Sequence, residues 1–159
     1  MHRILIFSDS HTDISICEKI INKISGVNMI IHAGDHAADA QLLQKHFPEL
    51  DVRFVRGNCD YSPVPDDLVF EAGGCRIFVS HGHKYNVKYD LGYRSLKKAA
   101  EEKNAALAVF GHTHNPYISN DGNLILLNPG SIRYGRTFGV AEIEDNNIKA
   151  DICDAGAWL

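Results

Sequence analysis

The sequence has little of what marks several large classes of protein. Its 159 residues carry 16 lysines and arginines against 20 aspartates and glutamates, so no basic excess indicates nucleic-acid binding. The apolar run at the amino terminus, Ile4–Phe7, is too short for a membrane span or a signal-peptide core. We therefore expect a cytoplasmic protein that works without a membrane and without stable nucleic-acid binding.

The chain also lacks closely spaced cysteines. None of its four cysteines forms a CxxC pair, which argues against a zinc-thiolate or dithiol redox motif. No internal repeat, low-complexity stretch or Pro/Gly-rich linker divides the chain. A length of 159 residues is typical of one domain, so we expect a single domain over residues 1–159.

What the sequence does contain is a series of short apolar runs, rich in Ile, Val and Phe and bounded by Gly, Asp or Asn. Such runs predict buried strands, here at 4–7, 29–31, 52–55, 77–79, 107–110 and 124–127. Helical patterns lie between several of them, at 14–24 (with Thr12 or Asp13 as N-cap), 39–47 and 91–104. The alternation of strand and helix in the first half predicts parallel βαβ units.

The last third follows a different pattern. Runs at 118–120, 124–127, 140–144 and 148–153 read as strands joined by tight turns, and the sequences SNDGN (119–123) and EDNN (144–147) are typical of hairpins. The fold class predicted from these patterns is α/β, with a mixed sheet and an antiparallel portion at the end.

Polar side chains follow five of the predicted strands directly. In open α/β sheets, sites form beyond the carboxyl ends of the strands, so these side chains are expected to lie at one edge. They are Asp9 and His11, Asp35, Asn58 with Cys59 and Asp60, His81 with His83, and His112 with His114.

Each of these residues alone is weak evidence, because a single histidine after a strand is more often a loop residue. Together they form a set of carboxylates, a carboxamide and imidazoles, which is typical of a metal site. Two of these aspartates, the asparagine and four of the histidines are already too many for one ion and suit two. Oxygen and nitrogen ligands without thiolate favour Mn, Fe, Ni, Co or Zn.

The order and spacing of these motifs resemble the calcineurin-like metallophosphoesterase family, and in particular its small, single-domain phosphodiesterase branch. The resemblance rests on Asp9-x-His11, Gly34-Asp35, Gly57-Asn58-x-Asp60, His81 beside glycine, Gly111-His112-x-His114 and the segment NPGS at 128–131. It implies a four-layer α/β/β/α sandwich, in which two mixed sheets face each other and helices flank them.

The resemblance also assigns ligands to two divalent transition-metal ions per chain, with manganese preferred and nickel, iron, cobalt or zinc as alternatives. One ion is expected to take Asp9, His11, Asp35 and His114, and the other Asp35, Asn58, His81 and His112, so that Asp35 bridges. The expected reaction is hydrolysis of a phosphodiester by a hydroxide shared by the two ions.

Two further residues are candidates for a catalytic contact. Many family members have histidine where this chain has Cys59, and a thiol is a poorer hydrogen-bond donor than imidazole. The small phosphodiesterase branch is similar in having cysteine here, and a packing role for Cys59 is at least as well supported. His83, two residues after His81, can compensate or can play a supporting or solvated role.

The expected substrate is a small or nucleotide-like phosphodiester, and homo-oligomers remain possible. Two alternatives stay open. A scaffold protein of membrane-coat complexes shares this fold but lacks the full ligand set, whereas all seven ligand positions are filled here. A phosphomonoesterase is disfavoured by Cys59 and by a short chain with little room for substrate-recognition insertions.

Overall fold

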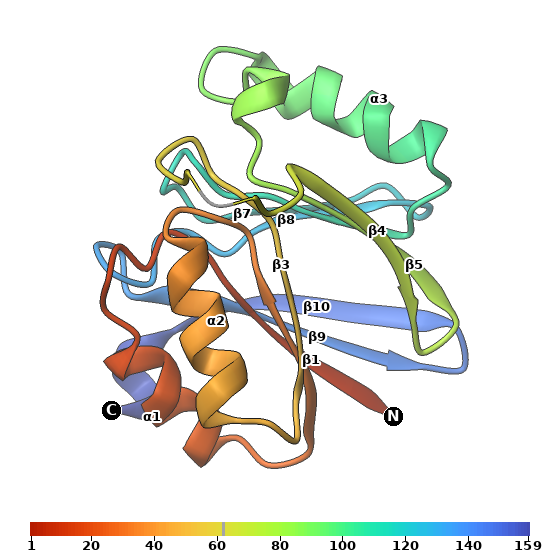
Figure 1. Cartoon of the computed structure of the whole chain (residues 1–159). Coiled ribbons are helices and arrows are strands. Elements are labelled where there is room, and N and C mark those ends of the chain that lie inside the picture. The colour runs from red at the N-terminus through yellow and green to blue at the C-terminus, as the bar shows by residue number, and fades with distance from the viewer. Residues whose placement is uncertain (62) are drawn as a thin grey trace.

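The computed structural model describes residues 1–61 and 63–159, and ten strands in this part of the chain form two five-stranded sheets (Figure 1). The first sheet has the order β10 (Asn147–Asp154), β9 (Thr137–Glu144), β1 (His2–Phe7), β2 (Val27–His32) and β3 (Asp51–Phe54). The second has the order β4 (Asp67–Ala72), β5 (Cys75–Ser80), β6 (Leu107–Val109), β8 (Ile125–Asn128) and β7 (Tyr117–Asn120).

Both sheets are mixed. In the first, β1, β2 and β3 pair in parallel, and β9 and β10 add antiparallel strands beside β1. In the second, β5, β6 and β8 pair in parallel, and β4 and β7 close the edges in antiparallel fashion. The expectation of parallel units followed by an antiparallel portion is confirmed.

The two sheets pack face to face around a shared apolar core. Side chains of alternating positions meet there from both sheets, among them Ile4, Ile6, Ile77, Val79 and Leu107. Alternate residues of the central strands face the opposite way and pack under helices, which explains why stretches such as Ile4–Phe7 and Ile77–Val79 are continuously apolar.

Helices cover the outer face of each sheet. On the first sheet, α1 (Ser15–Lys23) and α2 (Ala37–His46) pack with Leu5, Phe7 and Ile30; on the second, α3 (Arg94–Glu102) packs with Phe78 and Ala108. Figure 1 shows α3 on one side of the molecule and α1 and α2 on the other. The four-layer α/β/β/α sandwich is confirmed.

Two-residue turns set the register of the hairpins. Asp145 and Asn146 join β9 to β10 with φ of +50° and +63°, the backbone that a tight antiparallel hairpin requires. Gly73 and Gly74 do the same between β4 and β5, with φ of +57° and +83°. The strand β4 was not predicted from the sequence, although the glycine pair before Cys75 is a hairpin signal.

The helix boundaries differ from the sequence prediction by one to three residues, most at the start of the third helix. The helix expected over 91–104 begins only at Arg94, because Gly92 and Tyr93 have positive φ and separate it from a short 3₁₀ turn, η2 (Leu91–Tyr93). At α1, the N-cap position is Ile14, which offers no side-chain oxygen, so neither Thr12 nor Asp13 is the N-cap; the Asp13 carboxylate instead accepts the amide and hydroxyl of Ser15, the first helical residue, at 3.0 and 2.6 Å.

Within residues 1–61 and 63–159, no helix is long and apolar enough to cross a membrane.

Candidate metal centre

The seven predicted ligands all follow the carboxyl end of a parallel strand. Strands β1, β2 and β3 lead into the loops that carry Asp9, Asp35 and Asn58, and β5 and β6 lead into those that carry His81 and His112. Since the sheets face each other, the two sets of loops meet at one edge of the sandwich. The amide of Gly111, after β6, donates to the carbonyl of His81 at 3.0 Å, which joins the two loops of the second sheet.

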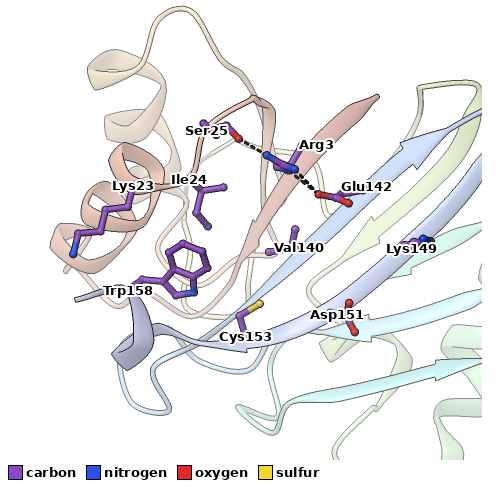
Figure 2. Close-up of a pocket in the computed structure, with 10 residues that line it drawn as sticks. All are labelled: Arg3, Lys23, Ile24, Ser25, Val140, Glu142, Lys149, Asp151, Cys153 and Trp158. Carbon is purple, nitrogen blue, oxygen red and sulfur yellow. Dashed lines mark hydrogen bonds and ion pairs between the residues drawn. The ribbon is translucent and has the colours of Figure 1, made fainter.

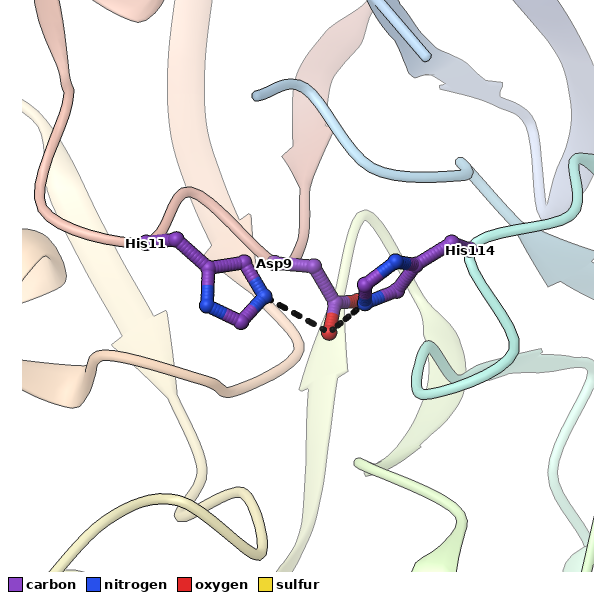
Figure 3. Close-up of side chains that lie close together, drawn as sticks. All are labelled: Asp9, His11 and His114. Atoms are coloured by element: carbon purple, nitrogen blue, oxygen red, sulfur yellow. Dashed lines mark hydrogen bonds and ion pairs between the residues drawn. The ribbon is translucent and has the colours of Figure 1, made fainter. Parts of the chain in front are cut away.

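Asp9 lies between two histidines from different sheets. Its Oδ1 is 3.1 Å from Nε2 of His114 and 3.9 Å from Nε2 of His11, and Figure 3 shows both imidazoles facing this oxygen. The three ligand atoms lie within 4.8 Å of one another, close enough to hold one metal ion. The Nε2 of His11 is buried and makes no hydrogen bond within the described residues.

A second group shares Asp9 and adds Asp35 and His81. The Nε2 of His81 is 3.5 Å from Oδ2 of Asp35, 3.0 Å from Oδ1 of Asn58 and 3.9 Å from Oδ1 of Asp9. Asp9, Asp35 and His81 are all buried, and their ligand atoms also lie within 4.8 Å of one another. The two groups therefore adjoin at the Asp9 carboxylate.

The remaining two histidines lie beside this second group. The imidazole centroid of His112 is 5.0 Å from that of His81, and His83 lies 5.5 Å from His81 and 6.1 Å from His112. His83 begins a 3₁₀ turn, η1 (His83–Tyr85), and its buried Nδ1 makes no hydrogen bond within the described residues.

The tautomer of His81 indicates that this group fits a cation. Its Nδ1 is 2.7 Å from the carbonyl oxygen of Ala33, which can only accept, so Nδ1 carries the proton. The Nε2 lone pair then faces the oxygens of Asp35 and Asn58, all of them acceptors. Only a proton or a metal ion relieves such an arrangement, and a carbonyl-oriented histidine is a common feature of metal sites.

The pKa directions agree with this need for positive charge. Burial works to lower the pKa of His81, but the hydrogen bond to Asp35 and the charges of Asp9 and Asp35 outweigh it and raise the pKa. The hydrogen bond to Asp9 raises the pKa of His114 despite burial. Burial would raise the pKa of Asp9 and Asp35, yet the facing histidines lower both.

His11, His83 and His112 shift the other way. Burial is the largest cause in each case, and it lowers the pKa of His11 and His83 and brings that of His112 to about 4. The charge of His81 lowers the pKa of His83 and His112 further. These imidazoles are held neutral at pH 7, which is the form that ligates metals.

Two glycines allow the loops to approach this closely. A Cβ on Gly57 would lie 2.0 Å from Oδ1 of Asp35, and one on Gly111 would lie 2.1 Å from Oγ of Ser8 and 2.8 Å from Oδ2 of Asp9. Any side chain at these positions would displace an aspartate of the centre. The glycines that accompany the polar motifs are thus explained by close contact.

The NPGS segment braces the centre, a role that sequence reasoning did not assign. The buried amide of Asn128 donates to the carbonyl of Gly111 at 3.1 Å and to the hydroxyl of Thr113 at 2.9 Å, which holds the loop of His112 and His114. Ser131 donates to the carbonyl of Asp9 at 2.9 Å, which holds the loop from the first sheet.

A second, fully buried network ties the loops of Asp9 and Asp35 together. The hydroxyl of Ser10 donates to the Asp39 carboxylate at 2.6 Å. Its oxygen is therefore the acceptor for Nε2 of His32, at 2.8 Å. The other ring nitrogen of His32, Nδ1, accepts the amide of Gly34 at 3.2 Å. Burial lowers the pKa of His32 to about 4, consistent with a neutral ring.

Cys59 lies beside the centre with an exposed side chain. Its backbone amide donates to Oδ1 of Asp35 at 3.0 Å, and burial together with the Asp35 charge raises the pKa of its thiol. The carboxylate of Asp60 is already occupied, because it accepts the amides of Ala37 at 2.9 Å and Gly57 at 2.8 Å. Asp60 therefore shapes the loop and is not free to orient a group at position 59.

A hollow of about 420 Å³ lies elsewhere, on the outer face of the first sheet (Figure 2). Ile24, Val140 and Trp158 contribute apolar surface, and the ion pair between Arg3 and Glu142 lies at its wall. None of the candidate metal ligands lines this hollow.

Comparison with known proteins agrees with the geometry. Residues 2–146 match the model of the calcineurin-like phosphoesterase superfamily domain, and the chain belongs to this family of metal-dependent phosphoesterases. The probable metallophosphoesterase YsnB of Bacillus subtilis is 35% identical over 136 residues, covering 84% of this chain and 76% of YsnB. A probable metallophosphoesterase of Methanocaldococcus jannaschii is 32% identical over 130 residues, covering 79% of this chain and 66% of that protein.

Solved structures share the fold over nearly the whole chain. A conserved uncharacterized protein from Streptococcus pneumoniae, a predicted phosphoesterase, superposes with a TM-score of 0.78 at 28% identity, covering 98% of this chain and 90% of that one. Two structures below 25% identity show the fold alone: an archaeal phosphodiesterase (TM-score 0.68, 22% identity, covering 95% and 99%) and zinc-complexed Vps29 of Entamoeba histolytica (0.73, 18%, covering 96% and 99%).

Proposed function

We propose that this metallophosphoesterase is a phosphodiesterase that uses two divalent transition-metal ions, with manganese preferred. The observation that carries the proposal is the pair of adjoining ligand groups around Asp9, which bring together side chains from both sheets. In the second group, Nε2 of His81 faces the oxygens of Asp35 and Asn58, and all of these atoms are acceptors. Such a pair of groups has the ligand number and type for two ions rather than one.

The chain's own residues set the charge and shape of the centre. Asp9 and Asp35 stay ionised because histidines face them, and His11 and His112 stay neutral because they are buried. In the assignment that the family resemblance implies, the first ion is held by Asp9, His11, Asp35 and His114, and the second by Asp35, Asn58, His81 and His112. The two groups of the structure share Asp9 instead, and Asp35 belongs only to the second of them, so the bridging role of Asp35 rests on the resemblance. These residues would hold the ions, whose chemistry when bound would be to lower the pKa of water and to neutralise charge on the phosphoryl oxygens.

His83 and Cys59 are proposed to face the substrate side of the centre. His83 is neutral and lies next to His81 and His112, so it can donate a hydrogen bond to a phosphoryl or leaving-group oxygen. The Cys59 thiol stays protonated and is the weaker donor of the two. A diester is favoured over a monoester because no strong general acid stands at position 59.

A non-catalytic scaffold of the same fold is the alternative from another class. All seven ligand positions of this chain carry metal-competent side chains, and buried carboxylates and imidazoles of this kind are costly to keep without a ligand. This observation favours the enzyme.

The test is hydrolysis by metal-free protein reconstituted with Mn, Ni, Co or Zn. Bis(p-nitrophenyl) phosphate and p-nitrophenyl phosphate share a leaving group, so their kcat/KM ratio compares a diester with a monoester directly. Metal content is measured on the same samples, and we expect two ions per chain and a preference for the diester. Binding of two metals without hydrolysis of either ester would support the scaffold instead.

Asp35→Asn provides the control within the centre. A neutral amide removes the charge that both ions are proposed to share, so both sites should lose metal. The matched variant Asp151→Asn removes an exposed carboxylate on the outer face of the first sheet and should keep full occupancy. Full occupancy and rate in Asp35→Asn would contradict the bridging assignment.

A further inference from the structure

An exposed tyrosine, Tyr134, lies directly against two of the proposed metal ligands. Its ring centroid is 5.3 Å from the imidazole of His11 and 5.8 Å from that of His114, and it is nearly parallel to His114 with an interplanar angle of 27°. The residue is nevertheless 66% exposed. One part of the ring therefore contacts the centre, and the rest is open to solvent beside it.

The loop that carries Tyr134 is fastened to the loop of Asp9. The hydroxyl of Ser131 donates to the carbonyl of Asp9 at 2.9 Å and accepts the amide of Tyr134 at 3.0 Å. The amide of Ile132 donates to the carbonyl of Ser8 at 3.1 Å, and Arg133 forms a close ion pair with Asp13. The Arg133 charge is engaged in this ion pair. The backbone that carries the tyrosine is thus fixed relative to the centre.

An aromatic ring fixed at the rim of a phosphoryl-binding centre can recognise a planar group attached to the phosphate. Stacking depends on a flat partner and not on a particular base or ring substituent. An alkyl or sugar substituent offers no such face. Tyr134 follows the NPGS brace by three residues, so the segment that holds the ligand loops also places the ring.

We propose that Tyr134 is a specificity-determining residue, which stacks on a nucleobase or aryl group of the substrate. The assignment rests on the proposed function for the position of the phosphate, and it narrows the substrate class to phosphate esters that carry a planar aromatic group. Simple alkyl phosphodiesters are then poor substrates because they leave this ring without a partner.

The deciding experiment compares AMP with ribose 5-phosphate, which differ only by the base. Their dissociation constants are measured by calorimetry on manganese-reconstituted protein, with metal content and phosphate release followed in parallel. We expect the wild type to prefer AMP by about tenfold, the ratio that ~1.4 kcal/mol of stacking gives. Tyr134→Phe should keep this ratio, and Tyr134→Ala should bring it close to one.

Tyr89→Ala is the matched control, since Tyr89 is 83% exposed and takes no part in the ring contacts among the described residues. It should keep the AMP preference. A wild-type ratio near one, or an equal loss of both ligands in Tyr134→Ala, would overturn the proposal. The second outcome would make the ring a support for His11 and His114 instead.

A hydrolytic comparison separates this proposal from the proposed function. Bis(p-nitrophenyl) phosphate and ethyl p-nitrophenyl phosphate release the same leaving group, so the remaining substituent alone differs. Loss of the aryl preference in Tyr134→Ala supports both proposals. Hydrolysis of neither diester, with the AMP preference present and dependent on Tyr134, would reject the phosphodiesterase and leave the stacking role standing.

Discussion

At the scale of single residues, His81 determines how the centre responds to pH. Its Nδ1 donates to Ala33, and its Nε2 faces Asp35 and Asn58, so a proton and a metal ion are alternative partners of Nε2. The pKa values of His81 and His114 are raised above the usual 6.5, which means that both protons are still held at a pH somewhat above that value. A metal ion and a proton therefore compete for Nε2 of His81 and for Nε2 of His114.

We expect manganese affinity to fall as the pH is lowered from 8 through 6.5. Below both raised pKa values, binding must displace two protons, so the affinity should drop by up to about 100-fold per pH unit. Activity at fixed manganese should follow the same curve and be low below about pH 6. Manganese titrations from pH 5.5 to 8 measure this, and a constant affinity over that range would contradict the ligand role of both histidines.

The second prediction at this scale concerns the leaving group. Cys59 is a poor proton donor because its thiol pKa is raised, so wild-type rates should favour aryl over alkyl leaving groups. Cys59→His places an imidazole there, but Asp60 already accepts two backbone amides and cannot orient it. We expect the variant to reduce the ratio of aryl to alkyl rates by less than about tenfold. This is well under the 10²–10⁴-fold rate increase that a well-placed general acid gives.

The measurement is kcat/KM across a series of leaving-group pKa values, at equal metal occupancy, with Cys59→Ser as the control that removes the sulfur without adding imidazole. A slope that is the same in all three proteins would mean that position 59 does not act on the leaving-group step.

At the scale of loops and strands, the centre depends on contacts that leave no room for a methyl group. Gly57→Ala would place a Cβ 2.4 Å from the amide of Asp35, as well as against its carboxylate. We expect a loss of manganese affinity of about 10–100-fold, the usual effect of disturbing the support of a ligand. Calorimetric titration with manganese gives the affinity directly.

Gly122→Ala is the matched control for that variant. Gly122 has a positive φ, +94°, which Gly57 does not, but a Cβ there meets nothing within 4 Å. It should cost about 1 kcal/mol of stability and leave metal binding unchanged. Equal metal affinity in the two alanine variants would show that the close approach at Gly57 does not matter.

The NPGS brace is the third feature of this scale. Asn128→Ala removes the buried donor to Gly111, the partly buried donor to Thr113 and the buried acceptor for Gly130, so we expect a loss of about 1–3 kcal/mol in the free energy of unfolding. The loop of His112 and His114 loses its support at the same time, and metal affinity should fall with it. Asn120→Ala, in an exposed hairpin, should change neither the free energy of unfolding nor the metal affinity by a comparable amount.

The elements differ in how far the sequence predicts them. The buried stretches of central strands, such as Ile4–Phe7 in β1 and Ile77–Val79 in β5, are apolar at every position, so their patterns are unambiguous. The edge strand β4 carries Asp67 and Glu71 and is half exposed, so it has no continuous apolar run to indicate a strand. The positive φ at Tyr93, which delays α3, depends on packing of that ring against Phe110 and Tyr117, and the helical pattern does not show it.

The candidate ligands were predictable because each follows a strand end, and parallel strands bring their ends together. The brace was not, because Asn128 reaches Gly111 across 17 residues and Ser131 reaches Asp9 across 122. Tyr134 was missed for the same reason: in the sequence it is one exposed aromatic residue, and only the fold places it on His11 and His114.

At the scale of the whole molecule, the proposed ions would connect the two sheets. Asp9, His11, Asp35 and Asn58 follow strands of the first sheet, whereas His81, His112 and His114 follow strands of the second. The shared apolar core already holds the sheets together, but at this edge buried carboxylates and imidazoles replace apolar side chains. Metal binding should therefore stabilise the sandwich as well as complete the centre.

We expect removal of metal to lower the thermal unfolding midpoint of the whole chain. A ligand present at 1,000 times its dissociation constant stabilises the native state by about 4 kcal/mol. For a chain of this size, each kcal/mol shifts the midpoint by roughly 2–4 °C, so treatment with a chelator should lower it by about 10 °C. Calorimetric scans of the manganese-loaded and chelated protein measure the shift, and readdition of manganese should reverse it. Asp35→Asn, scanned in the same two conditions, should show little difference between them, because it binds little metal in either. If the wild type unfolds at the same temperature with and without manganese while elemental analysis shows the metal bound, the ions do not connect the sheets.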